Sequence, residues 1–169
     1  SLMETKIPAS AGTIKYWVAK SAKERVFAGV KAKELKTVRG SKLVGLRYTG
    51  AFDDLPAIKK GSDKNDKFHT VAATDPLILP ISTEEGTGIV HTSTGTGVED
   101  HKFGKKIGLP IVSAIDDAAN YLPGFGFLAG KNAKKDPNLV LDYLRSFEDG
   151  KYLYRTMSYK HRYPSCWRC

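Results

Sequence analysis

Short apolar segments, separated by glycine, proline and polar residues, limit what this chain can fold into. Its 169 residues include 16 glycines and 8 prolines, and no apolar run approaches the roughly 18 residues that a membrane-spanning helix needs. A chain of this length usually forms one hydrophobic core. We therefore expect a single domain over 1–169, built from many short elements, with no membrane segment.

Strands are predicted where β-branched and aromatic residues gather between turn residues. The polar run 59–67 offers no apolar side chain to bury and is predicted to be a surface loop. The aromatic, Gly- and Pro-rich stretch 120–130 is also predicted to be a loop. The candidate strands are 13–20, 42–52, 68–73, 76–81, 86–92, 109–115 and 151–163.

Three segments carry helix signals. Ser21 and Glu24 stand at the spacing of a capping box, and 98–108 has acids in its first turn, which complement the helix dipole. The strongest pattern is 136–150, with Asp136 as N-cap, a proline at the first helical position and a glycine at the end. Many short strands with two or three helices predict an α+β fold or a barrel-like mixed sheet.

The stretch "GTGIVHTSTGTGVED" at 86–100 is the candidate functional segment. Neither glycine pair is a phosphate-binding motif, because the first lacks the third glycine of a dinucleotide fingerprint. The second pair is followed by Glu99 and Asp100, which would place negative charges where phosphates should lie. His91 and Asp100 then either share the rim of one pocket, or are a histidine satisfied by backbone and a solvated acid.

Metal and nucleophile sites receive little support from the same stretch. Glu99, Asp100 and His101 are adjacent on a predicted helix, so their side chains diverge and cannot chelate together. No G-x-S-x-G nucleophile motif occurs in the chain. We expect no metal in this domain, with Cys166 and Cys169 as a weak zinc candidate, because a C-x-x-C pair is half of a four-ligand site.

The start of the chain, its two cysteines and its charge distribution bear on its compartment and its partners. The start of the chain has no apolar signal sequence, and two reduced thiols suit the cytoplasm; residues 1–12 are expected to be a tag or linker. Residues 1–50 carry 11 Lys and Arg against 3 acids, 51–100 carry 4 against 9, and 101–169 carry 12 against 6. Basic flanks around an acidic middle suit a polyanion partner, or act only as a solubility device.

A set of motifs in fixed order resembles the editing domain of isoleucyl-tRNA synthetase. The likeness covers 16–169, and "KLVGLRYTGAF" at 42–52 looks like the family's strand before its variable loop. The motifs are "GTGIVH" at 86–91, an aspartate nine residues after His91, "GKKIGLPI" at 104–111, "LAGKNAKKDPNLVLDYL" at 128–144 and "HRYPSCWRC" at 161–169.

The resemblance implies a compact, mixed-sheet, β-barrel-like α+β domain of the isoleucyl/valyl/leucyl type. Its implied activity is hydrolysis of valine wrongly attached to isoleucine tRNA, and also of valyl-adenylate before transfer. Such a second sieve is needed because one methylene in an apolar pocket discriminates by only about 1–3 kcal/mol. We expect water attack on the ester to be aided by positioning more than by a side-chain nucleophile.

The resemblance also assigns roles to residues. Asp100 matches the acid that binds the aminoacyl ammonium group, and His91 matches the residue whose bulk excludes isoleucine, so these two are the catalytic-site candidates. The glycines would allow close approach of the terminal adenosine. The implied substrate-binding residues are Gly86, Thr87, Gly88, Thr92, Ser93 and Thr94.

Two departures from the family pattern leave alternatives open. Ser93 and Thr94 stand where the family has Ala-Pro, and the family's threonine-rich strand, roughly W-T-T-T-P-W-T-L-P, has no match in the chain. The alternatives are a non-hydrolytic module that binds tRNA or an amino acid, or the equivalent domain of valyl-tRNA synthetase.

Partners and cofactors follow from the same resemblance. We expect the acceptor end of isoleucine tRNA carrying valine as substrate, and the catalytic domain of a parent synthetase as neighbour, with 161–169 leading back to it. ATP, Mg²⁺ and zinc are expected only in the parent enzyme, with no cofactor in this domain. A monomer is expected.

Overall fold

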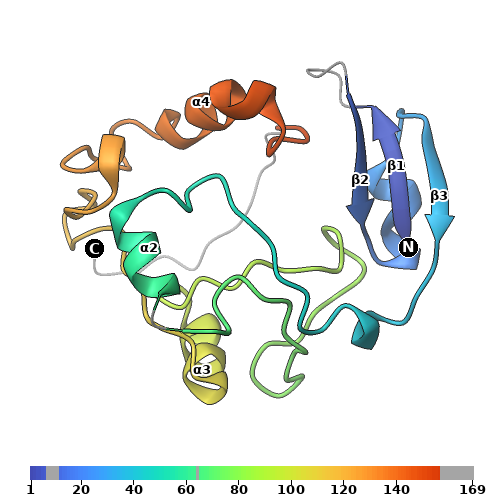
Figure 1. Ribbon diagram of the computed structural model, residues 1–169, viewed down its shortest axis with the longest axis horizontal. Coiled ribbons are helices and arrows are strands. Elements are labelled where there is room, and N and C mark those ends of the chain that lie inside the picture. The colour runs from blue at the N-terminus through green and yellow to red at the C-terminus, as the bar shows by residue number, and fades with distance from the viewer. Residues whose placement is uncertain (7–11, 64, 157–169) are drawn as a thin grey trace, which may run out of the picture.

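The structure is a computed structural model that describes residues 1–6, 12–63 and 65–156 (Figure 1). The strands are β1 (Leu2–Lys6), β2 (Thr13–Trp17) and β3 (Ala32–Lys36), and the α-helices are α1 (Lys23–Val26), α2 (Pro56–Ser62), α3 (Val98–Ile107) and α4 (Leu139–Ser146). Short 3₁₀ helices are η1 (Lys20–Ala22), η2 (Gly40–Lys42), η3 (Gly126–Leu128) and η4 (Phe147–Gly150). None of these helices has both the length and the apolar character that a membrane crossing needs.

The sheet in this part of the chain is small, antiparallel and open. Its order is β2-β1-β3, with Leu2 opposite Trp17 on one side and opposite Lys36 on the other. A mixed α/β composition with the strands gathered at one end is compatible with the expected α+β class. The β-barrel-like part of that expectation is wrong for the described residues, because three strands do not close on themselves.

The central strand β1 lies within 1–12, where we expected a tag or linker. The Ser1 nitrogen donates a hydrogen bond to the Val18 carbonyl at 2.7 Å, and the Val18 N–H donates to the Ser1 carbonyl at 3.0 Å. Met3 and Thr5 are buried on one face of β1, and the Thr5 hydroxyl donates to the Lys31 carbonyl at 2.8 Å. The N-terminal residues therefore complete the sheet.

A small aromatic core lies behind this sheet. Met3, Val18 and Phe27 are buried together, with Tyr16 packed against them. Tyr154 returns from far along the chain: its ring lies 5.2 Å from Tyr16, and its hydroxyl donates to the Val26 carbonyl at 3.2 Å. The two ends of the described chain thus meet in one core.

The helical expectations are largely confirmed, with shifted starts. The α3 helix forms where predicted and stops at Gly108, whose φ of 76° is left-handed. The α4 helix starts with Asn138 as N-cap, two residues after the predicted Asp136. Helix α1 follows η1, but no side chain caps it, so the predicted capping box of Ser21 and Glu24 does not form.

Most expected strands beyond 13–20 are not strands. The predicted buried strand 86–92 is irregular, and Ile89 and Val90 are 46% and 50% exposed. Segments 42–52 and 109–115 contribute only isolated bridges, and 59–67 overlaps helix α2 instead of being wholly loop. Of 151–163, residues 151–156 form no strand and the rest lie outside the described residues. Segment 68–73 contributes only Thr70, which pairs with Arg47 in one of these bridges, and 76–81 is irregular.

Helices α2 and α3 lie at the opposite end of the molecule from the sheet, and α4 runs along the top of the view toward the sheet (Figure 1). Stacked rings attach α4 to its neighbours: Tyr143 lies 5.2 Å from Phe52 and 4.6 Å from Phe127. The Tyr143 hydroxyl donates a hydrogen bond to the carbonyl oxygen of the buried residue Ala51 at 2.9 Å. These contacts hold the segment 47–53, which carries a second candidate site.

Candidate functional site

Asp100 is positioned by a turn that precedes α3. Gly97 is the N-cap, in an extended conformation, and Asp100 lies in the first helical turn. Its Oδ2 accepts a hydrogen bond from the Ser93 backbone N–H at 3.3 Å, while Oδ1 has no hydrogen-bond partner among the described residues. Asp100 is half-buried, so it is not the fully solvated acid of the alternative interpretation. One carboxylate oxygen is left to bind a ligand.

The turn 93–97 is held by contacts with the segment that follows α3. Thr94 is 8% exposed, and its hydroxyl donates to the Pro110 carbonyl at 2.7 Å. A Cβ at Gly95 would lie 2.2 Å from the Val112 carbonyl oxygen. The glycine therefore permits the turn to lie directly on the backbone of the chain after α3.

Gly86 and Gly88, the first glycine pair, lie against the η1 and α1 region next to the sheet. The Thr87 carbonyl accepts from the Ala19 N–H at 2.7 Å, and the Arg25 guanidinium donates to the Gly86 carbonyl at 2.7 Å. A Cβ at Gly88 would lie 2.5 Å from the Ala19 Cβ. The close approach at Gly88 is thus to the protein's own η1 region; whether Gly86 and Gly88 also admit an adenosine stays a prediction.

His91 lies between these two anchored pieces. It is exposed, and it makes no hydrogen bond or ion pair with any described residue, Asp100 included. The histidine satisfied by backbone is instead His101, whose Nδ1 lies 3.0 Å from the Thr94 carbonyl. The structure therefore brings Ser93, Thr94 and Asp100 together and leaves His91 and half-buried Thr92 beside them without a direct bond.

No cluster suited to a metal ion occurs in the described ranges, where no three His, Cys, Asp or Glu side chains gather. The zinc candidates Cys166 and Cys169 lie outside those ranges.

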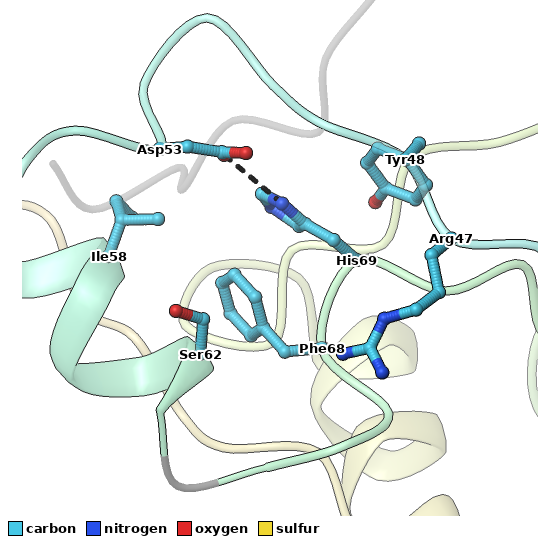
Figure 2. Close-up of a pocket in the computed structure, with 7 residues that line it drawn as sticks. All are labelled: Arg47, Tyr48, Asp53, Ile58, Ser62, Phe68 and His69. Carbon is cyan, nitrogen blue, oxygen red and sulfur yellow. Dashed lines mark ion pairs between the residues drawn. The ribbon is translucent and has the colours of Figure 1, made fainter.

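A second cluster, which the sequence did not reveal, lies around His69. Figure 2 shows its imidazole directed toward Asp53, with Nδ1 3.1 Å from Oδ1. The contact is not aligned as a hydrogen bond, because Oδ1 has no hydrogen-bond partner among the described residues. Oδ2 accepts from the Gly50 N–H at 2.8 Å. Asp53 and His69 form an ion pair when the imidazole is protonated.

Two aromatic rings stack on the same imidazole. Its centroid is 4.3 Å from the Phe68 ring and 4.8 Å from the Tyr48 ring. Burial, and then the Asp53 charge, raise the pKa of the Tyr48 phenol. These residues line a hollow of about 170 Å³ with Arg47, Ile58 and Ser62 (Figure 2). Ser62 donates to the Lys59 carbonyl, so it is not joined to the imidazole as a nucleophile.

Sequence reasoning missed this cluster for a simple reason. Asp53 and His69 are 16 residues apart in segments without a recognisable motif, and Tyr48 was assigned to a strand. The pairing depends on backbone bonds between the two segments, since the Tyr48 N–H donates to the His69 carbonyl at 3.0 Å. Arg47 and Thr70 form an isolated bridge beside it.

No family model matches the chain. The isoleucine–tRNA ligase of Thermococcus kodakarensis is 38% identical over 158 residues, 91% of this chain. That of Pyrococcus furiosus is 37% identical over 94% of the chain, and that of Saccharolobus islandicus is 32% identical over 88%.

The chain spans 14% of the length of each of these relatives. Identity at this level over almost the whole chain, repeated in several organisms, reflects common descent. The chain is therefore homologous to one segment of isoleucine–tRNA ligase.

Proposed function

We propose that this chain is the editing segment of an isoleucine–tRNA ligase and hydrolyses valine from mischarged isoleucine tRNA. The homology supports a segment of that enzyme, and the ordered motifs around His91 and Asp100 support the editing segment. The observation that carries the proposal is the geometry of Asp100. Ser93 holds one carboxylate oxygen, and the other has no partner among the described residues.

In this proposal Asp100 binds the ammonium group of the aminoacyl ester. A hydrogen bond between charged groups contributes about 1.5–3 kcal/mol, and it fixes the ester beside the turn 93–97. Water adds to the ester carbonyl, the bond between the carbonyl carbon and the ribose oxygen breaks, and the departing ribose oxygen takes the proton that the water gives up and becomes a hydroxyl. Valine and uncharged tRNA are released, with catalysis by orientation of substrate and water.

His91 sets the size of the amino acid accepted. Its exposed imidazole stands in the segment that leads from the glycine pair to the Asp100 turn. Filling that space disfavours isoleucine, which is one methylene larger than valine, and a methylene changes the barrier by about 1–3 kcal/mol. The same site would accept the valyl group of the adenylate.

The test uses the full natural protein that contains this chain, and its substrate is isoleucine tRNA that carries valine. Asp100→Asn keeps an oxygen for the Ser93 N–H but removes the charge, so we expect kcat/KM for deacylation to fall about 10- to 150-fold. Glu99→Gln is the matched control, because it removes a neighbouring exposed acid from the same helical turn. Equal rates for the two variants would refute the role of Asp100.

A size test addresses His91 separately. Replacing it with alanine should raise hydrolysis of correctly charged isoleucyl-tRNA relative to valyl-tRNA, because the larger side chain then fits. The ratio of the two deacylation rates is the measurement. An unchanged ratio would refute the role of His91 in excluding isoleucine.

A non-hydrolytic module that grips tRNA or an amino acid is the second candidate, favoured by the unmatched threonine-rich strand. Titration of tRNA at several salt concentrations, together with a deacylation assay, separates the two. Salt-dependent binding without turnover favours the module, and turnover excludes it. Faster hydrolysis of threonyl-tRNA for valine would instead indicate the domain of a valyl enzyme.

The remaining assignments belong to the same proposal. The partner is the acceptor end of isoleucine tRNA, presented by the catalytic domain of the parent ligase, in a cytoplasmic monomer. ATP, Mg²⁺ and zinc would act in that catalytic domain and take part in no step at Asp100.

A further inference from the structure

Two hollows meet at Arg47 and Tyr48, away from the Asp100 turn. The smaller is the 170 Å³ hollow around His69. The larger measures about 610 Å³ and is lined by Arg47, Tyr48, Thr49, Lys151 and Tyr152. Its volume lies in the range of small-molecule sites. Neither His91 nor Asp100 lines either hollow.

Tyr48 is a supported aromatic surface between the hollows. Its ring is stacked on His69, which Phe68 and Asp53 hold in turn. The backbone of the same residue is fixed by its hydrogen bond to the His69 carbonyl. Despite this support the side chain is 47% exposed and lines the larger hollow. A flat ligand can therefore stack on a ring that is already positioned.

Two cations stand beside this surface. Arg47 is exposed, and its guanidinium forms no hydrogen bond or ion pair with any residue that the structure describes. The Lys151 ammonium lies 5.3 Å from the Tyr152 ring and 2.6 Å from a Glu148 carboxylate oxygen. Both side chains of that pair are about half exposed, so the pair is weak and exchanges readily for another anion.

The Asp53 carboxylate carries a negative charge that acts on the Tyr48 phenol. Asp53 lines only the smaller hollow, where it faces His69 and accepts from the Gly50 N–H. An anion in the larger hollow meets Arg47 and Lys151 instead. The larger hollow thus offers an aromatic surface next to the Arg47 guanidinium and a Lys151 ammonium whose partner is the exposed Glu148.

We propose that the larger hollow binds a nucleotide unit of single-stranded RNA, with a base stacked on Tyr48 and the adjoining phosphates held by Arg47 and Lys151. Stacking on an exposed aromatic ring contributes about 1–3 kcal/mol per base and tolerates any base. Cations from two separate segments, each next to a tyrosine in the sequence, suit a strand that continues past one nucleotide. This site is additional to the proposed editing site and does not depend on hydrolysis at Asp100.

Binding is tested on the full natural protein with tetra-adenylate RNA, an abasic ribose-phosphate tetramer and free AMP. Tyr48→Leu removes the ring, and we expect the dissociation constant for tetra-adenylate to rise about 5- to 150-fold. Tyr48→Phe keeps the ring and should stay within about twofold of the natural protein. The abasic tetramer should bind the natural protein and Tyr48→Leu equally.

The phosphate contact is tested by charge. Arg47→Gln should weaken tetra-adenylate binding. It should also make the plot of log binding constant against log salt concentration less steep, by about the amount expected for one phosphate contact. Lys102→Gln, which removes an exposed cation of α3, is the matched control and should change neither. A 5-iodouridine placed in the tetramer should crosslink to the peptide containing Tyr48, which separates this site from other RNA contacts of the protein.

The opposite results are equally clear. Equal losses in Tyr48→Leu and Tyr48→Phe would overturn the stacking role, and so would natural protein that binds the abasic tetramer as tightly as tetra-adenylate. If AMP binds as tightly as the tetramer, the ligand is a free nucleotide and the proposal of single-stranded RNA is refuted. Asp100→Asn should leave tetra-adenylate binding at Tyr48 intact, so failure of the editing proposal and failure of this one are distinguished.

Discussion

Gly95→Ala tests whether the Asp100 turn depends on contact with the backbone after α3. The added Cβ would lie 2.2 Å from the Val112 carbonyl oxygen and 3.1 Å from the Ser113 Cα. Backbone cannot rotate away as a side chain does, so the turn must move. Such overpacking costs about 1–3 kcal/mol, and the reduced freedom of the unfolded chain returns about 0.4–1 kcal/mol. We expect a net local loss of about 1–2 kcal/mol.

Hydrogen exchange of individual amides in the full natural protein measures this loss where it occurs. The Thr96 N–H donates to the Ser93 carbonyl, and the Ser93 N–H donates to Asp100. A loss of 1–2 kcal/mol should speed exchange of both amides about 5- to 30-fold.

Gly40→Ala is the control for that measurement, because a Cβ there meets nothing within 4 Å and the backbone is not left-handed. It should leave exchange of the Ser93 and Thr96 amides unchanged. If Gly95→Ala behaves like Gly40→Ala, the turn is not held against Val112 and the positioning of Asp100 must be explained differently.

Two further predictions concern the support of the two ends of the molecule. Hydrogen bonds from Lys23 and then Thr37 lower the pKa of Glu34 from 4.5 to about 2, so its stabilising contribution is present above pH 4.5 and is lost as pH falls toward 2; an NMR titration should show this midpoint, and Lys23→Met should raise it. Tyr143→Phe keeps the ring stack but removes the hydrogen bond to the Ala51 carbonyl, which should cost about 0.5–1.5 kcal/mol, measured by exchange of amides in α4; no change would exclude that bond.

Local signals in the sequence predicted the helices better than the strands. The α3 helix has acids at its start and Gly108 at its end, and both features act within a few residues. A strand needs a partner, and a short apolar run does not identify one. Residues 86–92 have the composition of a buried strand, yet their hydrogen bonds go to Ala19 and Arg25. The central strand β1 was missed for the complementary reason, since its partners are 13–17 and 32–36.

The candidate site also combines a locally predictable position with contacts that the sequence did not predict. The helix-start position of Asp100 followed from the glycine before Val98 and the pattern after it, and the structure confirms that position. Its hydrogen bond with Ser93 and the support of Thr94 by Pro110 join residues 7 and 16 apart, through a turn that no motif specifies. The roles assigned to His91 and Asp100 in hydrolysis remain predictions for the deacylation assay.

The glycines of 86–97 explain why the two halves of this stretch must be considered together. Gly88 lies against Ala19 near the sheet, whereas Gly95 lies against Val112 beside α3. His91 lies between these two attachments, so its distance from Asp100 depends on how the sheet end and the helical end are held relative to each other. Tyr154, which reaches from the C-terminal part back to the Val26 carbonyl, is one of the residues that hold them. If the editing proposal holds, weakening that contact should therefore alter the proposed selection by size at His91 before it alters the proposed binding of the ammonium group by Asp100.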